Sequence, residues 1–359
     1  MARLSSSSTA LGWNKLVLLT AMLACAGEVC AVPTNSQHYD VEEGQSIQEA
    51  IHKASHGDEI RVGPGTYPEQ LTIDKDGISL VGSGSILVPP SIPFNNTCTG
   101  LAGNDTQAGI CVTGYEVELA PYLFDHRKVL SVGRYVKDVY ITGFEVHGFT
   151  GENIAVVGGK DTVVSKNTLV NGDQYGFLTA GSVNTLATYN NITTDVIRYI
   201  GMCMDDLSDA EFSSNEITGY YIGLCVQTKG AVLKQNRVKS TCVGAFVDPG
   251  VHEANLIENH IGPSNPDCPG EGPRGGINIY GASYTVVVKN LIEGQKNHNS
   301  SAGIVLLDDT TTPDLFVAEG NIIKKNIFRD NDFDIFVNST STENVVEDNT
   351  CSAPGPGCA

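Results

Sequence analysis

The sequence predicts an all-β protein, a single-stranded right-handed parallel β-helix (a solenoid) built from short stacked coils. A period near 23 residues recurs, apolar runs are strand-length and rich in β-branched residues, and no helical periodicity runs through the repeats. An asparagine marks the period at Asn167, Asn191, Asn215, Asn236, Asn259, Asn290, Asn326 and Asn349. A second short strand lies between successive asparagines, as in "IGMCMD" and "IGLCVQ". Leucine-rich repeats share the period, but their Leu-x-x-Leu-x-Leu frame is absent.

The repeated asparagine is predicted to build the scaffold and not to carry chemistry. It lies where a strand turns, and stacked side-chain amides can hydrogen-bond from one coil to the next. Such bonds satisfy turn backbone that a continuous solenoid would otherwise leave unpaired.

The first 31 residues are predicted to be a secretory signal peptide. Two basic residues precede an apolar run that ends at Ala26, which is too short to cross a bilayer and is followed by small residues. Cleavage after Ala31 leaves eight cysteines, whereas cleavage after Ala26 leaves nine, and the even number favours Ala31. The mature chain is therefore expected to be secreted and extracellular, without a membrane segment. Five Asn-x-Ser/Thr sequons fit a glycoprotein, at Asn95, Asn104, Asn191, Asn299 and Asn338.

The charge balance excludes two classes of partner. The whole chain carries a net charge of −19, and the leader contains Arg3, Lys15 and Glu28, so the mature chain has 20 basic and 40 acidic residues. This field repels nucleic acid and anionic membranes. It does not exclude an acidic polysaccharide, because a local basic strip or a bridging cation can reverse the sign inside a groove.

A single domain over residues 32–359 is expected to begin with a helix. "SIQEAIHKA" has apolar residues at helical spacing and Ser46 as its N-cap, and a helix here would cover the open end of the core. "DEIRVGPGTYPEQLTI" and "GISLVGSG" give the first strands. Residues 89–128 break the rhythm with three prolines, two sequons and two cysteines, so a long surface loop is expected before coiling resumes near Val129.

Strand alternation predicts which residues of the second strand point inward and which point outward. Inward pairs are predicted at Ile154/Val156, Phe177/Thr179, Met202/Met204, Leu224/Val226, Ala245/Val247, Ile277/Ile279, Ile304/Leu306 and Ile335/Val337. Cys203 and Cys225 share one outward position on neighbouring coils, so they are predicted to form a disulfide. The other pairs are predicted as Cys98–Cys111, Cys242–Cys268 and Cys351–Cys358.

The N-terminal stretch "SIQEAIHKASHGDEIRVGPGTYPEQLTIDKDGISLVGSG" resembles the opening of the pectin-lyase-like superfamily of right-handed β-helix proteins. The asparagine-containing coils resemble the parallel β-helix repeat group of that superfamily. The resemblance covers nearly all of the mature chain and implies the fold. Members include polysaccharide lyases, pectin methylesterases, polygalacturonases, uronan epimerases and binding proteins, so it does not fix the activity.

The catalytic phrases of these classes are matched only in part. The methylesterase motifs Gln-Asp-Thr and Asp-Phe-Ile-Phe-Gly are missing, and "FDIFVN" is only superficially similar to the second of them. "MDDL" supplies the paired Asp205–Asp206 of polygalacturonases without their other phrases. "GEGPRGG" places Arg274 beside a proline, as in pectate lyases, without the full run or a calcium-binding carboxylate cluster. "VDPGVHE" resembles the Asp-Pro-His-Glu of uronan epimerases, but two residues intervene before His252.

The outward positions after each inward pair point to a site. They are small or apolar at the ends of the series and polar in the middle, at Asp205, Gln227, Asp248 and Tyr280, with Tyr199, Tyr221 and Arg274 nearby. Sugars bind to surfaces that combine carboxylates, amides and aromatic rings. We expect Asp205 and Asp248 to bind a cation or to act as acid and base, and Arg274 to neutralise a uronate carboxylate. The tyrosines would stack on sugar rings, and Gln227 would contact hydroxyl groups. The competing interpretation is an ordinary solvated face of an acidic protein.

The favoured function is a secreted polysaccharide lyase that acts on a uronate-containing cell-wall polymer. Asp205 and Asp248 lie two coils apart, about 9.6 Å, which is at the edge of the window for an inverting glycoside hydrolase. A uronan epimerase, or a non-catalytic glycan-binding or host-interacting protein, is the further alternative. Ca²⁺ is the one cofactor considered, and no metal ligands are assigned. The histidines, His126 among them, lack metal-binding spacing and are interpreted as surface or turn residues. The chain is expected to be a monomer.

Overall fold

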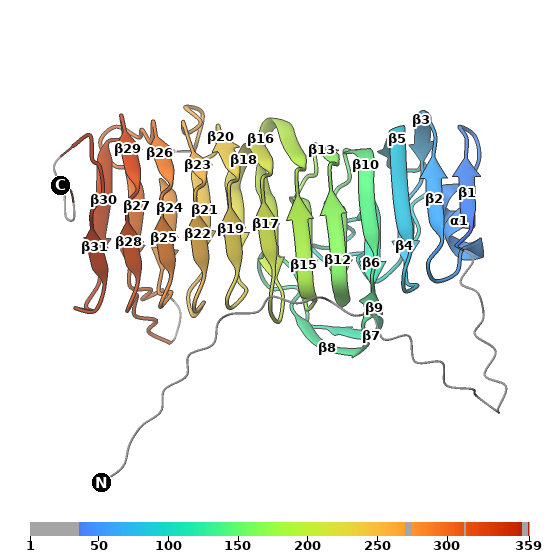
Figure 1. Ribbon diagram of the computed structural model, residues 1–359, viewed down its shortest axis with the longest axis horizontal. Coiled ribbons are helices and arrows are strands. Elements are labelled where there is room, and N and C mark those ends of the chain that lie inside the picture. Colours follow the sequence, from blue (N-terminus) through green and yellow to red (C-terminus); the bar gives the residue numbers. More distant parts are fainter. Residues whose placement is uncertain (1–35, 270–273, 312–313, 354–357, 359) are drawn as a thin grey trace, which may run out of the picture. The chain divides into compact units, whose positions relative to one another are not determined.

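The computed structural model describes residues 36–269, 274–311, 314–353 and 358. The predicted leader and its cleavage site lie outside these residues. Twenty-nine strands form one parallel sheet that winds along the chain, and β7 (Tyr115–Leu119) and β8 (Val129–Arg134) form a separate antiparallel pair (Figure 1). Within the described residues α1 (Ile47–Lys53) is the single α-helix. The predicted all-β parallel architecture is therefore confirmed.

Each full coil contributes strands to three columns, which stack rung upon rung. The first column contains β1 (His38–Val41), β2 (Glu59–Val62), β5 (Ser79–Val88), β9 (Val136–Lys137), β10 (Tyr140–His147), β12 (Gly159–Ser165), β15 (Val183–Thr188), β17 (Glu211–Ser213), β19 (Val232–Lys234), β22 (Asn255–Ile257), β25 (Val286–Val288), β28 (Ile322–Lys324) and β31 (Val345–Glu347). The second contains β3 (Gly65–Pro68), β13 (Thr168–Val170), β20 (Arg237–Lys239), β23 (His260–Ile261), β26 (Leu291–Glu293) and β29 (Ile327–Arg329), together with the ends of β5 and β10.

The third column carries the predicted outward series. It contains β4 (Leu71–Ile73), β6 (Ile110–Thr113), β11 (Glu152–Val157), β14 (Tyr175–Ala180), β21 (Val243–Val247), β24 (Gly275–Tyr280), β27 (Ala302–Leu307) and β30 (Phe333–Asn338). Two long strands, β16 (Asn191–Asp205) and β18 (Glu216–Val226), run through both the second and the third columns.

The predicted register of the third column is confirmed along its whole length. Ile154 pairs with Phe177, and the same register passes through Met202, Leu224, Ala245, Ile277, Ile304 and Ile335. These side chains are at most 5% exposed and belong to the main hydrophobic core between the columns. Alternation therefore turns the intervening residues away from the core.

An asparagine ladder holds the corner between the first and second columns. The Asn167 side-chain oxygen accepts from the Phe144 backbone N–H. Each later side-chain oxygen accepts from the backbone N–H and the side-chain amide of the asparagine one rung earlier, as Asn236 does from Asn215 at 3.0 Å each. The residue before each asparagine is left-handed, with φ between 54° and 59°. The ladder consists of Asn167, Asn190, Asn215, Asn236, Asn259, Asn290, Asn326 and Asn349.

One predicted member of the ladder is wrong by one residue. Asn190 is buried and continues the ladder, whereas Asn191 is exposed at the start of β16. The pair "NN" offered two candidates, and the sequence alone did not say which one follows the left-handed residue. That residue is Tyr189, with φ 56°.

The N-terminal helix forms as the capping signal predicts. The Ser46 side chain accepts a hydrogen bond from the backbone N–H of Glu49, and Ile47, Ala50 and Ile51 are buried. The helix packs against β1, β2 and β4. Its role as a cover for the open end of the core stays a prediction.

Residues 89–128, predicted as a surface loop, contain two strands. β6 is a fully buried rung of the third column, paired with β4 and β11, while β7 pairs with β8 beyond residue 128. We call residues 89–109 and 114–135 the insert. Apolar side chains of the insert and the outward face of the third column form a second hydrophobic cluster that includes Leu101, Val157 and Leu178. The small and apolar outward residues of the early rungs are therefore covered by the insert.

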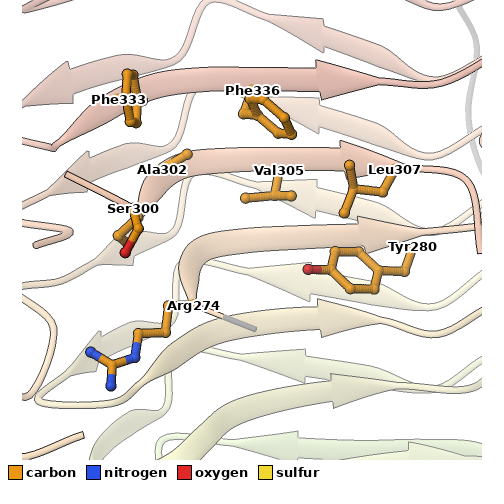
Figure 2. A pocket seen from close by; sticks show the side chains of 9 residues that line it. Arg274, Tyr280, Ser300, Ala302, Val305, Leu307, Phe333 and Phe336 are labelled. Carbon is orange, nitrogen blue, oxygen red and sulfur yellow. The ribbon is translucent and has the colours of Figure 1, made fainter. Parts of the chain in front are cut away.

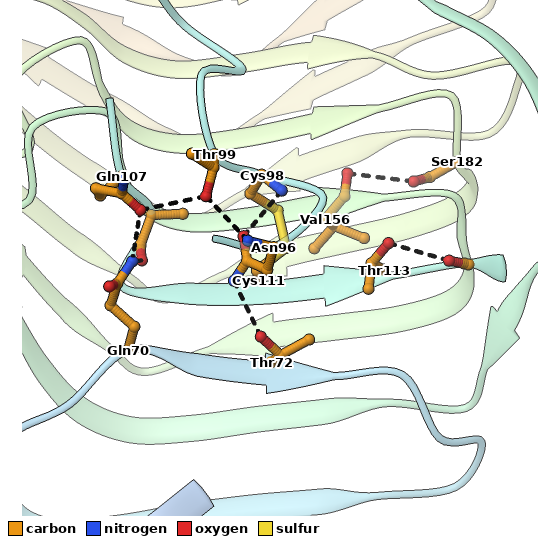
Figure 3. Close-up of a disulfide and its surroundings, with 12 residues drawn as sticks. Gln70, Thr72, Asn96, Cys98, Thr99, Gln107, Cys111, Thr113, Val156 and Ser182 are labelled. Carbon is orange, nitrogen blue, oxygen red and sulfur yellow. Dashed lines mark hydrogen bonds between the residues drawn. A yellow bond between two sulfur atoms is a disulfide. The ribbon is translucent and has the colours of Figure 1, made fainter. Parts of the chain in front are cut away.

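All four predicted disulfides are present. Cys203 and Cys225 are register partners on β16 and β18, so their bond joins neighbouring rungs. Cys98–Cys111 ties the first part of the insert to β6, where Asn96 donates from its side chain to the Thr72 hydroxyl at 2.9 Å (Figure 3).

We predict that Asn190→Ala lowers the free energy of unfolding by about 1–3 kcal/mol, because it leaves buried polar groups of Asn167 without an acceptor. Asn191→Ala is the matched control and should change it by less than about 0.5 kcal/mol, because Asn191 is exposed. Denaturant unfolding of protein from a bacterial periplasm, which forms disulfides without sequon glycosylation, measures both. If Asn190→Ala and Asn191→Ala lower the free energy of unfolding equally, the stabilising role of the asparagine ladder is wrong.

Candidate functional site

Three of the predicted site residues lie together where the insert ends on the third column. Asp205, Gln227 and Asp248 directly follow Met204, Val226 and Val247, which are register partners, so their side chains lie on successive rungs. They line a pocket of about 270 Å³, called here the acidic pocket, with Lys128, Lys229 and residues 249–251. Their carboxyl and amide groups are half-buried.

A lysine from the insert connects these three side chains. The Lys128 ammonium donates to Asp205 Oδ2 at 3.1 Å and to Gln227 Oε1 at 2.5 Å. The Gln227 amide in turn donates to Asp248 Oδ2 at 2.5 Å. The Lys128 ammonium thus lies between the Asp205 carboxylate and the Gln227 amide. The same amide binds the Asp248 carboxyl group.

The interpretation of His126 as a surface or turn residue is wrong, because the histidine is buried beside Asp205. Its side chain is fully buried, and its ring nitrogens lie 3.0 Å from Asp205 Oδ2 and 3.2 Å from the Tyr175 hydroxyl. An imidazole that donates from Nε2 to Asp205 and accepts at Nδ1 from Tyr175 satisfies all three groups. Burial raises the pKa of Tyr175 well above its usual value, so its hydroxyl keeps the proton that it donates.

The two carboxyl groups have pKa values shifted in opposite directions. Burial alone would raise the pKa of Asp205, but the hydrogen bond from His126 and the charge of Lys128 outweigh it and lower the value. Burial raises the pKa of Asp248 to about 7, and the Gln227 hydrogen bond only partly offsets this. Near neutral pH, Asp205 is ionised and Asp248 is poised to gain or lose a proton.

The adjacent residue of "MDDL" has a structural role. Asp206 is buried and accepts from the Thr179 hydroxyl at 2.8 Å and from the Ser182 backbone N–H at 3.1 Å. Burial raises its pKa to about 6. Asp206 directly follows the end of β16 and turns its carboxyl group to these buried donors, whereas Asp205 lines the acidic pocket, so the two do not act as a carboxylate pair on one surface.

Tyr199, predicted to stack on sugar, lies against the insert. Its hydroxyl donates to Asp125, and its ring meets the Tyr175 ring edge-on with centroids 6.2 Å apart. Burial and the Asp125 hydrogen bond raise the pKa of Tyr199. Tyr199 thus contributes to the wall that holds Asp125 and the neighbouring His126 in place.

Arg274 and Tyr280 line a different pocket, of about 320 Å³, which extends over β24, β27 and β30 (Figure 2). We call it the aromatic pocket. The Arg274 guanidinium donates to the backbone oxygens of Cys268, at 2.7 Å, and Pro269. Burial raises the pKa of Tyr221, and the positive charge of Arg274 acts against this rise. The structure therefore divides the predicted groove into two pockets, with Arg274 away from the aspartates.

A calcium ion is the one cofactor considered from the sequence, and its usual ligands include carboxylates. Among the described residues, no three His, Cys, Asp or Glu side chains come together as ligands for a metal ion. The Asp205 carboxylate is already paired with His126 and Lys128. In the same part of the chain, no helix has the length and apolar character needed to cross a membrane.

A buried carboxyl group lies behind the site. Glu152, at the start of β11, is fully buried, and neither of its carboxyl oxygens has a hydrogen-bond partner. Its register partner is Tyr175, which links it to the His126 side of the acidic pocket. Burial raises the pKa of Glu152 to about 8, so it is protonated in the folded state at neutral pH.

Comparisons with known proteins identify the fold. Residues 200–359 match the family described as "Right handed beta helix region". No curated protein matches the chain in sequence.

Similar solved structures include alginate lyase from Paenibacillus sp. str. FPU-7 (14% identity, TM-score 0.55, 84% of this chain and 98% of that chain covered). DFA-IIIase from Arthrobacter chlorophenolicus A6 in complex with GF2 gives 13% identity and a TM-score of 0.55 over 90% and 100% of the two chains. The mannuronan C-5 epimerase AlgE4 A-module from Azotobacter vinelandii has 12% sequence identity and a TM-score of 0.53, and the match covers 87% of this chain and 93% of that chain. At these identities the likeness establishes the fold alone.

We predict that Glu152→Gln raises the thermal midpoint relative to wild type, by an amount that grows as pH rises from 5 to about 8 and then levels off. The folded-state pKa of about 8 exceeds the unfolded value of 4.5, so the folded wild type holds a proton that the unfolded chain releases. Stability from Glu152 is therefore fully present below pH 4.5 and falls until about pH 8. Glutamine has no such proton to lose.

The control for this measurement is Glu343→Gln, which removes the same charge at an exposed position. Calorimetry of the three proteins across the pH range should give parallel curves for Glu343→Gln and wild type. If the Glu152→Gln curve is parallel as well, the raised pKa is wrong.

Proposed function

Because the chain is a right-handed parallel β-helix repeat protein with the fold of the pectin-lyase-like superfamily, we propose that it is a secreted polysaccharide lyase. Its substrate is a polymer that contains uronate residues, such as a cell-wall polysaccharide. The four disulfides, together with the leader predicted from the sequence, support secretion. The acidic pocket supports the chemistry.

The observation that carries the proposal is Asp248, an accessible carboxyl group with a pKa of about 7, in a pocket that also presents two lysines. In a chain with a net charge of −19, Lys128 and Lys229 bring two positive charges beside the two aspartates of the pocket and offset their negative charge. Such a pocket suits a sugar that carries a carboxylate.

The elimination reaction balances with these groups. Lys128 pairs with the uronate carboxylate and withdraws charge, which acidifies the C–H bond alpha to it. The ionised Asp248 takes that proton, the electron pair forms a carbon–carbon double bond, and the glycosidic oxygen leaves. Water in the open pocket returns a proton to the leaving oxygen. The products are a new reducing end and an unsaturated uronate.

Asp205 and His126 position the cation in this scheme. Asp205 accepts from both His126 and Lys128, so its carboxylate is already engaged and orients Lys128 toward the centre of the pocket. The Tyr175 hydroxyl fixes the imidazole from the other side. We therefore assign Asp205 as a positioning residue and Asp248 as the catalytic base.

An inverting glycoside hydrolase is the second candidate, because the pKa values of the two aspartates are pushed apart. A protonated Asp248 would act as general acid and an ionised Asp205 as general base, about 9.6 Å apart across two rungs, at the edge of the inverting window. An epimerase would share the proton abstraction by Asp248. A non-catalytic glycan-binding protein would use the same pockets without turnover.

The decisive assay incubates the protein with a panel of uronans and neutral glycans. Ultraviolet absorbance of the unsaturated product and the formation of reducing ends are followed together. A lyase raises both, a hydrolase raises reducing ends alone, and an epimerase or a binding protein raises neither.

We predict that lyase activity rises as pH increases through about 7, because the base form of Asp248 is populated only above its pKa. The slope has the opposite sign for the hydrolase, in which Asp248 must hold a proton and activity declines above that pH. A profile of kcat/KM from pH 5 to 9 measures the sign. A profile that is flat through this range would remove Asp248 from either role.

We predict that Asp248→Asn lowers kcat by about 10²–10⁴-fold, the usual contribution of a general base. The thermal midpoint should stay within a few degrees of wild type, because an outward residue adds little to the core and asparagine keeps the acceptor for Gln227. The matched control is Asp209→Asn, an exposed aspartate four residues after Asp205, which should retain full activity. Full activity in Asp248→Asn would overturn the assignment.

A further inference from the structure

The aromatic pocket exposes large apolar side chains on an outward face. Phe333 and Phe336 of β30 are 49% and 48% exposed, and β27 adds Val305 and Leu307 beside them (Figure 2). Tyr280 of β24 completes the wall, and its ring meets Phe246 edge-on at 5.0 Å between centroids. Outward positions of a solenoid usually carry polar residues, so a patch of rings here marks a binding surface.

Two polar groups in this region lack the partners that burial normally demands. Asn278 lies between Phe246 and Val305 in the register of the third column, is fully buried, and has no partner for either atom of its amide. The Arg274 Nε is also buried and unpaired, although the same guanidinium donates to Cys268 and Pro269. Native structures rarely leave such groups unsatisfied unless a ligand or a water contacts them.

The two pockets lie along one outward ladder. Tyr280 directly follows Ile279, the register partner of Val247, so it occupies the ladder position next to Asp248. The acidic pocket therefore ends one rung before the aromatic pocket begins. A polymer bound at Asp248 and laid across the rungs would extend over Tyr280 toward Phe336.

The charge of this region complements an anionic polymer. The chain has a net charge of −19, so an anion approaches this face only where a cation offsets the field. Arg274 supplies that cation at the rim of the aromatic pocket. Its planar guanidinium suits a carboxylate better than an ammonium group does.

We propose that the aromatic pocket binds a further uronate residue of the same polymer chain whose cleavage is assigned to Asp248. The sugar ring packs its C–H face on Phe336 and Tyr280, and its carboxylate pairs with Arg274. The nature of the ligand rests on the proposed function, but binding at this pocket does not require turnover. The protein thus holds its substrate across several rungs of the third column.

The test measures binding of a uronate hexasaccharide and of a neutral hexasaccharide by titration calorimetry. The parent protein carries Asp248→Asn, so that no ligand is consumed. Phe336→Ala should weaken binding of both ligands about tenfold, because it removes stacking. Arg274→Gln should weaken the uronate ligand about tenfold and the neutral ligand less than twofold. Tyr189→Ala, which removes a 64% exposed ring outside the pocket, is the control and should change neither.

Each outcome distinguishes this site from the proposed reaction. Uronate affinity that is unchanged in both Phe336→Ala and Arg274→Gln overturns the site, even if the wild-type protein cleaves uronans. Equal losses for both ligands in Arg274→Gln overturn the carboxylate pairing, because general damage to the fold would act in this way. If the wild-type protein cleaves none of the uronans but Phe336→Ala and Arg274→Gln weaken binding as predicted, the binding site is retained and the lyase is rejected.

Discussion

The asparagine ladder at the first corner is the constraint on which the rest of the structure depends. From Lys166 onward, each coil turns sharply after its first-column strand, and a non-glycine residue there takes a left-handed conformation that is unfavourable by itself. The buried amide that follows offsets this cost, because it bonds the backbone and side chain of its neighbour on the adjacent rung. The corners therefore stack in register. Once they do, strands about 4.8 Å apart place equivalent residues of the third column directly over one another.

The insert determines which outward residues of the third column are covered. Over the early rungs it buries outward residues such as Val157 and Leu178 in a second apolar cluster. At its edge it supplies His126 and Lys128 to Asp205, which lies half-buried beside solvent. Both carboxyl groups at this edge are desolvated, which by itself raises a pKa. For Asp248 burial dominates and the pKa is raised, whereas for Asp205 the contacts with His126 and Lys128 outweigh burial and the pKa is lowered.

The sequence predicted what depends on period and alternation, and it failed where tertiary docking decides. Inward pairs, the Cys203–Cys225 bond and the common ladder of Asp205, Gln227 and Asp248 all follow from a two-residue alternation repeated every coil. His126 and Lys128 belong to the insert, which has no repeat, so nothing in their spacing indicated that they would reach Asp205. Arg274 was placed with the aspartates because it is near them in rung order, but its guanidinium is held by backbone oxygens beside the aromatic pocket.

The contrast between Asp205 and Asp206 shows why this scaffold can carry a site without losing its core. The two residues are chemically identical and adjacent, yet Asp206 turns to buried hydroxyl and amide donors, whereas Asp205 faces the insert and solvent. Substitution of the inward residue would leave Thr179 and Ser182 without their acceptor, a cost to the fold itself. Substitution on the outward ladder changes charge and shape above a core that it does not enter. A β-helix thus separates core residues from surface residues by the alternation along each strand, and the insert determines which of the surface residues are covered.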